Sequence, residues 1–241
     1  MKRLSIAILL ILGSLTIWAQ FPFPDTVGLG QVIHHYAYTL QYSEEHEQPR
    51  WVAYELTRQK VEGTFPRRDN FREDPDVLTG SSTLADYKPT SSTYARGHLA
   101  PAGDMKWSPQ AMDESFLMSN MSPQLHSFND GIWNRMENRV RQWARLYDTI
   151  WIVTGPVLEP PMEHIGPNHV SIPRYFYKIA LDPKRRTAIA FLLVHEACKG
   201  PLQAFATSID EVEALTGLDF FHDLPDEEAI ESSYNLDLWT W

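Results

Sequence analysis

The chain has 241 residues, a formal net charge of −10 and one cysteine, Cys198. A single cysteine excludes an intrachain disulfide and a cysteine-rich metal site. The excess of acidic residues argues against a protein that binds nucleic-acid phosphates over its whole surface, since such proteins carry an extended basic surface. The acidity is uneven, however: residues 208–237 hold ten Asp or Glu and no Lys or Arg, whereas residues 134–145 hold four Arg and one Glu. A local basic face can therefore still bind phosphate.

The first residues are typical of a secretory signal peptide. Lys2 and Arg3 precede an apolar run over residues 6–19, which ends in the small residue Ala19. The run is too short to span a bilayer, since a span needs about 20 apolar residues. We expect residues 1–19 to be removed, residues 20–241 to form one domain, and the mature protein to be secreted or periplasmic without a membrane anchor.

The middle of the chain predicts strands and one long loop. Between residues 31 and 57, aromatic and β-branched residues recur at strand-like spacing on both sides of the polar segment 44–50. Residues 62–93 are rich in Pro, Asp, Arg and Ser and predict a surface loop, a kind of segment that is often functional. Residues 149–155, 174–181 and 187–194 predict strands, with a hairpin turn at 182–186.

Two helices are predicted. In the first, over 208–217, Ser208 and Glu211 have capping-box spacing and Gly217 stands at the C-terminal end. The second begins near Ser127, with Ser127 and Asp130 as candidate caps. Its apolar face is formed by Ile132, Met136, Val140, Trp143 and Tyr147. The irregular mixture of strands and helices favours an α+β fold.

The second helix also carries polar residues beside its apolar face. At about 100° per residue, Asn129, Glu137 and Arg141 fall within one arc, and Arg135 borders the apolar face on its other side. An amide oxygen, an acid and a guanidinium on one helix edge suit a hard cation and a phosphate, because Mg²⁺ prefers oxygen ligands. Each residue alone has a plainer interpretation: Asn129 as a turn residue, and Glu137 with Arg141 as a surface ion pair.

Ordered motifs around these residues resemble the DNA/RNA non-specific endonucleases. The family's Asp-Arg-Gly-His stands here as Ala-Arg-Gly-His at residues 95–98, and its Ser-Asn-Met-Ser-Pro-Gln stands at residues 119–124. The family's Asn-x-Gly-x-Trp begins at Asn129, and its glutamate follows eight residues later as Glu137. Together with shorter matches, the resemblance runs from about residue 33 to residue 221.

The resemblance implies a ββα-metal (His-Me finger) nuclease, with a central mostly antiparallel sheet flanked by helices. It implies that His98 is the general base and that Asn129 binds a hydrated Mg²⁺, for which Mn²⁺ can substitute. Glu137 would hold metal-bound waters, while Asn120 and Gln124 would brace the site. The implied reaction is hydrolysis of phosphodiester bonds in DNA and RNA.

Arginines are expected to bind the substrate phosphates. Arg141 matches a family arginine, and either Arg67 or Arg68 supplies another from the loop before the histidine. Arg96 would order the site or contact phosphate, and Arg135 is a further candidate for substrate binding. A guanidinium suits two phosphate oxygens better than an ammonium does.

Ala95 is the one clear departure from the family pattern. The family's Asp at this position is neither the base nor the metal ligand, so its loss affects the expected rate more than the expected reaction. Two alternatives stay open: a nucleic-acid-binding module without catalysis, and a narrower phosphodiesterase acting on small phosphate esters, which the net charge favours. The oligomeric state is also open, a dimer being one candidate.

Overall fold

The structure is a computed structural model that describes residues 21–25 and 30–241. The predicted signal peptide lies outside the described residues. Within them, no helix has the length and apolar character needed to cross a membrane.

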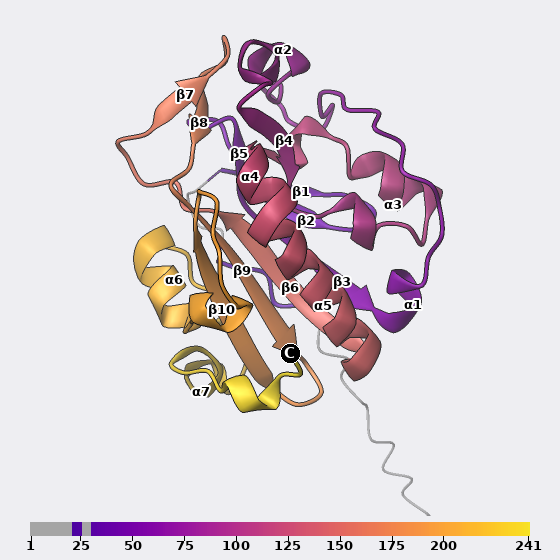
Figure 1. Ribbon diagram of the computed structural model, residues 1–241, viewed down its shortest axis with the longest axis vertical. Coiled ribbons are helices and arrows are strands. Elements are labelled where there is room, and N and C mark those ends of the chain that lie inside the picture. The colour runs from indigo at the N-terminus through magenta and orange to yellow at the C-terminus, as the bar shows by residue number, and fades with distance from the viewer. Residues whose placement is uncertain (1–20, 26–29) are drawn as a thin grey trace, which may run out of the picture.

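A seven-stranded sheet forms the centre of the molecule (Figure 1), and every neighbouring pair in it is antiparallel. The strands lie in the order β1 (Gln31–His34), β2 (Thr39–Ser43), β3 (Gln48–Thr57), β6 (Thr149–Pro156), β9 (Tyr175–Asp182), β10 (Thr187–Val194) and β11 (Ala206–Thr207). The predicted α+β fold with a mostly antiparallel sheet is confirmed, as is the hairpin turn at 182–186.

Strand β3 begins inside the polar segment that was expected to break it. The reason is that Gln48 is buried but satisfied: its side-chain Nε2 donates to the carbonyl oxygens of His46 (3.2 Å) and Ser171 (2.6 Å). A buried amide with partners costs far less than an unpaired one.

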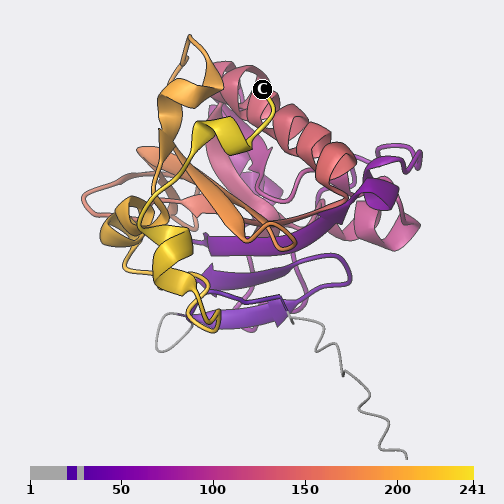
Figure 2. The same ribbon diagram turned by 90° about the horizontal axis from the view of Figure 1, so that it is seen from below.

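Helices cover both faces of this sheet. Helix α5 (Asn134–Tyr147) packs on one face, and helices α6 (Ile209–Thr216) and α7 (Glu227–Glu231) lie on the other, as Figure 2 shows from below. Strand β6 serves both layers, because its successive side chains alternate between the face of α5 and the face of α6. The two cores therefore lie back to back across one sheet.

The remaining elements are short and lie mainly between the strands. They are α1 (Arg58–Val61), α2 (Leu84–Tyr87), α3 (Pro109–Glu114), β7 (Glu163–Ile165), β8 (Val170–Ile172) and the 3-10 turns 88–90, 102–104, 118–120, 202–205 and 236–238. The predicted loop 62–93 is largely irregular, although α2 interrupts it where Thr83 and Asp86 form a capping box.

Two strands and a helix follow one another beside the main sheet. Strands β4 (Tyr94–His98) and β5 (Met121–Leu125) form an antiparallel hairpin, in which His98 pairs with Met121. The chain then continues through α4 (His126–Phe128) and the turn η4 (Asn129–Trp133) into α5. This succession is the ββα unit that the resemblance implied.

The start of the second helix differs from the prediction. Neither Ser127 nor Asp130 caps it: α4 begins after Leu125 without a side-chain cap, and η4 is a π-type turn. Gly131 takes the non-helical angles φ −91° and ψ −109°, which a residue without Cβ adopts easily. A uniform 100° per residue therefore does not apply between Asn129 and α5.

The other helix predictions are largely confirmed, although α6 shows only the Ser208 half of the predicted capping box. Most of the predicted apolar face is buried, with Met136 and Trp143 fully enclosed on α5, whereas Tyr147 is partly exposed and Ile132 lies in the turn before the helix. In α6, Ser208 Oγ accepts from the backbone N–H of Glu211, and Gly217 ends the helix at φ 67°.

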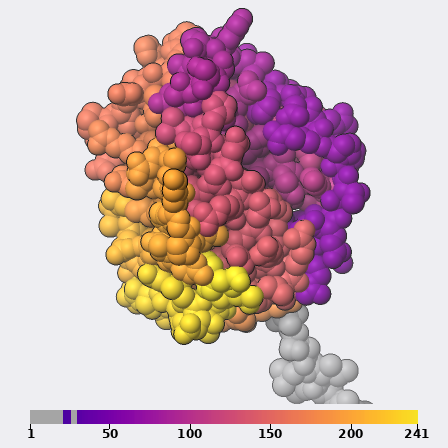
Figure 3. All heavy atoms as spheres, in the orientation of Figure 1, coloured from indigo at the N-terminus to yellow at the C-terminus, as the bar shows by residue number. Residues whose placement is uncertain are grey.

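The C-terminal residues return across the molecule to α5. Trp143 Nε1 donates to the carbonyl oxygen of Thr240 (2.7 Å), and the rings of Trp143 and Trp239 lie 4.5 Å apart. Figure 3 shows the pink surface of α5 between the purple N-terminal part and the orange and yellow C-terminal part. Helix α5 is thus held from several sides, which fixes the side chains that it presents at its first turns.

Candidate active site

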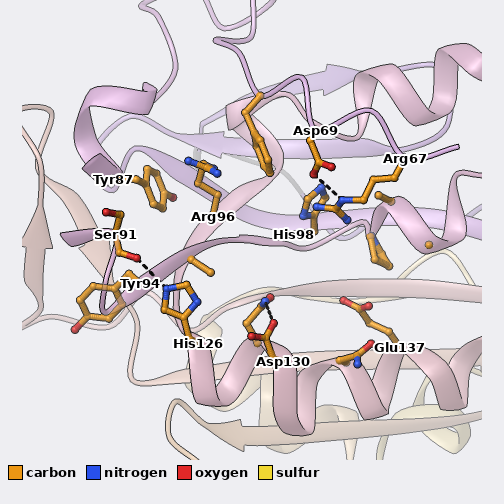
Figure 4. Close-up of a pocket in the computed structure, with 17 residues that line it drawn as sticks. Arg67, Asp69, Tyr87, Ser91, Tyr94, Arg96, His98, His126, Asp130 and Glu137 are labelled. Carbon is orange, nitrogen blue, oxygen red and sulfur yellow. Dashed lines mark hydrogen bonds and ion pairs between the residues drawn. The ribbon is translucent and has the colours of Figure 1, made fainter. Parts of the chain in front are cut away.

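A cavity of about 490 Å³ opens where the ββα unit meets the loop that precedes it (Figure 4). Five of the predicted site residues line it: Arg67, Arg96, His98, Asn129 and Glu137. The other lining residues are Asp69, Phe71, Tyr87, Ser91, Tyr94, Ala95, Pro101, Ala102, Gly103, His126, Asp130 and Asn134. Side chains far apart in sequence thus meet at one solvent-connected space.

His98 ends strand β4 and is held by aromatic contacts. Its ring packs edge-on against Phe116 (5.0 Å, 89°) and Phe71 (5.6 Å, 62°). Trp133 Nε1 donates to the His98 carbonyl oxygen at 3.1 Å, which ties the end of the strand to the turn η4. Nε2 of His98 is buried and has no hydrogen-bond partner among the described residues, while the residue as a whole lines the cavity.

The surroundings of His98 keep its ring neutral. Burial is the main cause that lowers its pKa, to about 3, and the positive charges of Arg67 and Arg96 lower it further. A neutral imidazole at neutral pH can accept a proton. An anion bound near the two arginines would offset their charge and raise the pKa of His98 again.

Two buried amide side chains, Asn120 and Gln124, pack against strands β4 and β5. Asn120 Oδ1 accepts from Ala100 N–H (2.9 Å) and Asn120 Nδ2 donates to the Ala100 carbonyl oxygen (2.9 Å), which fixes the segment after His98. Gln124 lies against Gly97, where an added Cβ would stand 2.3 Å from the Gln124 side chain. Neither Asn120 nor Gln124 is among the cavity-lining residues.

Asn129 stands on η4, opposite the histidine strand. Its Nδ2 donates to Asp130 Oδ1 at 2.9 Å, a bond drawn in Figure 4. This orientation leaves the amide oxygen without a hydrogen bond among the residues that the structure describes. The π-type turn therefore presents a free oxygen donor to the cavity.

Glu137 lies in the first turn of α5 and also lines the cavity. Burial raises the pKa of its carboxyl above the ordinary value, and the charges of Arg141 and Lys178 oppose that shift. Lys178 is itself buried, with its Nζ 4.5 Å from the centre of the Trp133 ring and 3.1 Å from Thr154 Oγ1, and burial lowers its pKa. Glu137 would gain from a cation in the cavity, because a positive charge stabilises its ionised form.

Arg141 is placed differently from the expectation that it clamps phosphate. It does not line the cavity; its Nη1 donates to Asp104 Oδ1 at 2.6 Å and lies 3.9 Å from Glu137 Oε2. The other oxygen of Asp104 accepts from Tyr54 OH at 2.8 Å. The guanidinium of Arg141 thus forms a largely buried ion pair with Asp104, and it contacts Glu137 on the side away from the cavity.

The remaining arginines separate into two groups. Arg67 and Arg96 line the cavity, with Arg67 Nε donating to Asp69 Oδ1 (2.6 Å) and the Arg96 guanidinium 4.2 Å from the centre of the Phe71 ring. Arg68 instead lies over the Phe65 ring, and Arg135 donates to the Gly200 carbonyl oxygen at 2.8 Å. Arg68 and Arg135 are therefore not brought to the cavity, in contrast to the expectation for Arg135.

Several residues of the site were not singled out from the sequence. His126 Nε2 lies 2.9 Å from the Ser91 carbonyl oxygen at one end of the cavity, and Asp130 orients Asn129. Asp104 is the buried partner of Arg141. These three residues are close in sequence to the histidine and asparagine motifs. That closeness alone does not distinguish a site residue from its neighbours in the chain.

The arrangement is suited to hydrolysis of an anionic ester. A neutral imidazole lines the same cavity as an amide side chain and a carboxyl, and two guanidinium groups border it. Oxygen donors of this kind suit Mg²⁺, which keeps several of its waters. The imidazole is placed to accept a proton from a water, and the guanidinium groups are placed to bind a phosphate.

Comparison with known proteins agrees with this geometry. Residues 21–227 match the model of the DNA/RNA non-specific endonuclease family. The chain is 33% identical to the mitochondrial nuclease EXOG of Xenopus laevis over 90% of this chain and 65% of that protein. It is 33% identical to the mitochondrial endonuclease G of Homo sapiens over 80% of this chain and 70% of that protein. The chain thus spans less than two thirds of the EXOG relative.

A solved structure extends the likeness to three dimensions. A chain in the crystal structure of the EndoG/EndoGI complex superimposes with a TM-score of 0.75 and 29% identity, covering 82% of this chain and 88% of that chain. These findings correct the expected location. The prediction of a secreted or periplasmic protein is wrong by this comparison, because the EXOG and endonuclease G relatives are named as mitochondrial nucleases.

Proposed function

Because the chain belongs to the DNA/RNA non-specific endonuclease family, we propose that it is a metal-dependent nuclease that hydrolyses phosphodiester bonds in DNA and RNA. The observation that carries the proposal is the convergence of His98, Asn129 and Glu137 on one cavity of about 490 Å³. Residues 20–241 would act as one catalytic domain.

The proposed roles follow from the position of each side chain. The imidazole of His98, which lines the cavity, accepts the proton of the attacking water. Glu137 orients water within the cavity, and Arg141 positions Glu137 through the ion pair with Asp104. Arg67 and Arg96 bind the phosphate that brings the scissile bond to the histidine.

The donor set fits a hard divalent cation, and the family is metal-dependent. Asn129 Oδ1 is the direct protein ligand in this proposal, and Mg²⁺ is the preferred ion, with Mn²⁺ able to replace it. When bound, the ion neutralises charge on the phosphate and stabilises the leaving oxygen. Few direct protein ligands are expected, because Mg²⁺ is commonly held through one or two side chains and its own waters.

The first experiment is digestion of plasmid DNA and of a long RNA by the purified chain. With Mg²⁺ we expect complete degradation of both, and with excess EDTA we expect no cleavage until Mg²⁺ is added back. Circular dichroism in EDTA checks that the protein remains folded. A folded protein that cleaves neither substrate in Mg²⁺ or Mn²⁺ contradicts the proposal.

The same assay separates the two alternatives. Binding of a labelled duplex in Mg²⁺ without cleavage indicates a binding module. Cleavage of a dinucleotide but not of a long duplex indicates a narrower phosphodiesterase. The presence of a base, an oxygen ligand and arginines at one cavity favours an enzyme over a binding module, and the nuclease relatives favour a nuclease over a narrower phosphodiesterase.

Arg67→Ala and Arg68→Ala form a matched pair of predictions. We expect Arg67→Ala to weaken phosphate binding, with kcat/KM for DNA falling about 10-fold or more, since a charge-assisted hydrogen bond contributes roughly 1.5–3 kcal/mol. Arg68→Ala should change kcat/KM less than about 3-fold, as expected for a side chain outside the cavity. Both are measured by initial cleavage rates at several salt concentrations; equal losses contradict the assignment.

Ala95→Asp should keep the activity or raise it. Ala95 pairs with Gln124 across the hairpin, so their side chains lie on the same face. Both side-chain polar atoms of Gln124, together with Arg96 Nε, are buried without hydrogen-bond partners among the described residues. An aspartate at position 95 brings an acceptor beside Gln124. Cleavage rates and melting temperatures check this; Ala95→Leu, which adds volume without an acceptor, is the control and should give no gain.

A further inference from the structure

A second group of acidic residues lies on the face of the sheet opposite to the active-site helix. Asp210 and Glu213 stand one turn apart on α6, and Glu231 ends α7. One carboxylate oxygen from each of the three residues lies within 4.8 Å of the other two. The proposed nuclease function does not use this group, so an explanation of it has to come from its own surroundings.

Glu231 is the unusual member of the group. Its residue is only 3% exposed, and Oε1 has no hydrogen-bond partner among the described residues. An unpartnered buried carboxyl oxygen is costly unless a cation or a proton compensates it. Asp210 is exposed and Glu213 is half-buried, so the group runs from the interior to solvent and an ion can reach it.

Among the residues that the structure describes, no basic side chain forms an ion pair with Glu213 or Glu231, and the charges that act on both are acidic. Residues 208–237, which include both helices, contain ten acidic residues and no Lys or Arg. Around Glu231, the further acidic side chains Asp219 and Glu227 add to the negative charge. Burial, followed by the charge of Glu213 and then by the other acidic neighbours, raises the pKa of Glu231 to about 9 when no cation is present.

A second acidic group in the protein shows what a compensated site looks like. Asp74 lies close to His35 and Asp76, but its carboxylate oxygens accept from His35 Nε2 at 2.9 Å, from the Asp76 N–H at 2.9 Å and from Ser119 Oγ. That group is satisfied within the protein. In the other group, Glu213 Oε1 accepts from the Phe220 N–H at 2.7 Å, but the buried Oε1 of Glu231 has no hydrogen-bond partner among the described residues.

We propose that Asp210, Glu213 and Glu231 bind one divalent cation, Ca²⁺ in preference to Mg²⁺, and that this ion joins α7 to α6. Oxygens on opposite sides of a bound Ca²⁺ stand about 4.6–5.2 Å apart, given metal–oxygen distances of 2.3–2.6 Å, and the three carboxylates fit within that span. Ca²⁺ accepts irregular oxygen sets, whereas Mg²⁺ demands a near-octahedral one. Waters would complete the shell on the exposed side.

The ion would act on stability rather than on chemistry. Ile230, next to Glu231, packs with Val212 of α6 in the core layer on this face of the sheet. A cation that neutralises Glu231 holds α7 against that layer. The site is independent of the cavity around His98, so each can be present without the other.

The test measures melting of the full chain with Asn129→Ala as background, which removes the proposed catalytic metal ligand. In 5 mM CaCl₂ relative to EDTA, we expect the melting temperature to rise by roughly 5–10 °C, the rise for a ligand far above its dissociation constant. MgCl₂ at the same concentration should give a clearly smaller rise. Calcium titration by calorimetry should show one site per chain.

Further substitutions in that background locate the site. Glu231→Gln should abolish the calcium shift, whereas Glu228→Gln, which removes an exposed charge from the same helix, should keep it. If Glu231→Gln does not fold, Asp210→Asn tests the same site, with Glu211→Gln as its exposed control. A chain whose melting temperature is unaffected by calcium, or a shift that survives Glu231→Gln or Asp210→Asn, overturns the proposal and leaves Glu231 as a protonated buried acid.

Discussion

His98→Ala should reduce cleavage of DNA and RNA by about 10²–10⁴-fold, the contribution typical of a general base. The reason is that the ring of His98 is clamped between Phe71 and Phe116 at the cavity and forms no hydrogen bond with the described residues. Because the substitution leaves the arginines and Asn129 in place, binding of DNA should be nearly unchanged. Single-turnover cleavage and equilibrium binding in Mg²⁺ separate the two effects.

Two further variants make the His98 prediction specific. His222→Ala removes an exposed histidine far along the chain and should leave the rate within about 2-fold, as for a surface substitution. His98→Asn keeps a polar side chain but has no basic nitrogen, so it should be as inactive as His98→Ala. A His98→Asn protein with substantial activity would show that the side chain acts by packing or hydrogen bonding rather than as a base.

The sheet was predictable because alternation and β-branched residues mark its strands. Thr149–Pro156 and Thr187–Val194 follow the predicted ranges closely, as each buries most of an apolar run. The hairpin that carries His98 was implied by the family resemblance rather than by periodicity. Polar residues such as Arg96 and Gln124 interrupt any alternating pattern there, because they serve the site instead of a core.

The supporting network behind the cavity was not predictable. Tyr54, Asp104 and Arg141 are separated by 50 and 37 positions in the sequence, yet one carboxylate joins them. Neither spacing nor propensity encodes such a contact, which depends on how the ββα unit packs on the sheet. For the same reason Arg141 could be expected at a phosphate and is found in an ion pair.

The turn at Asn129 could not be predicted from helical periodicity either. A count of 100° per residue assumes regular helix, and Gly131 departs from it at no steric cost. Asn129 and Glu137 still share the cavity, but they do so across a π-type turn. Such turns are frequently found at functional sites, since they re-aim a side chain without ending the helix.

Because this turn places Asn129 at the cavity, replacing Asn129 should weaken metal binding. Asn129→Ala removes the one direct protein oxygen proposed for the metal, so cleavage at 1 mM Mg²⁺ should fall about 10²-fold or more. A lost ligand at a metal is expected to cost at least as much as a lost supporting contact, which costs roughly 10–100-fold. Higher Mg²⁺ should restore part of the rate, because the remaining waters and Glu137 still favour the ion.

Asn129→Asp is the sharper variant. It keeps an oxygen ligand, but it replaces the amide that donates to Asp130 Oδ1 at 2.9 Å by a second carboxylate. Like charges at that distance repel unless a cation lies between them, so the variant should melt at a lower temperature in EDTA and recover in Mg²⁺. Asn235→Ala removes the side-chain cap of the turn 236–238 far from the cavity, so any loss of melting temperature it causes should not recover in Mg²⁺. If Asn129→Ala retains the full rate at 1 mM Mg²⁺, the metal is held elsewhere, and the convergence of the amide with His98 on one cavity is not a metal site.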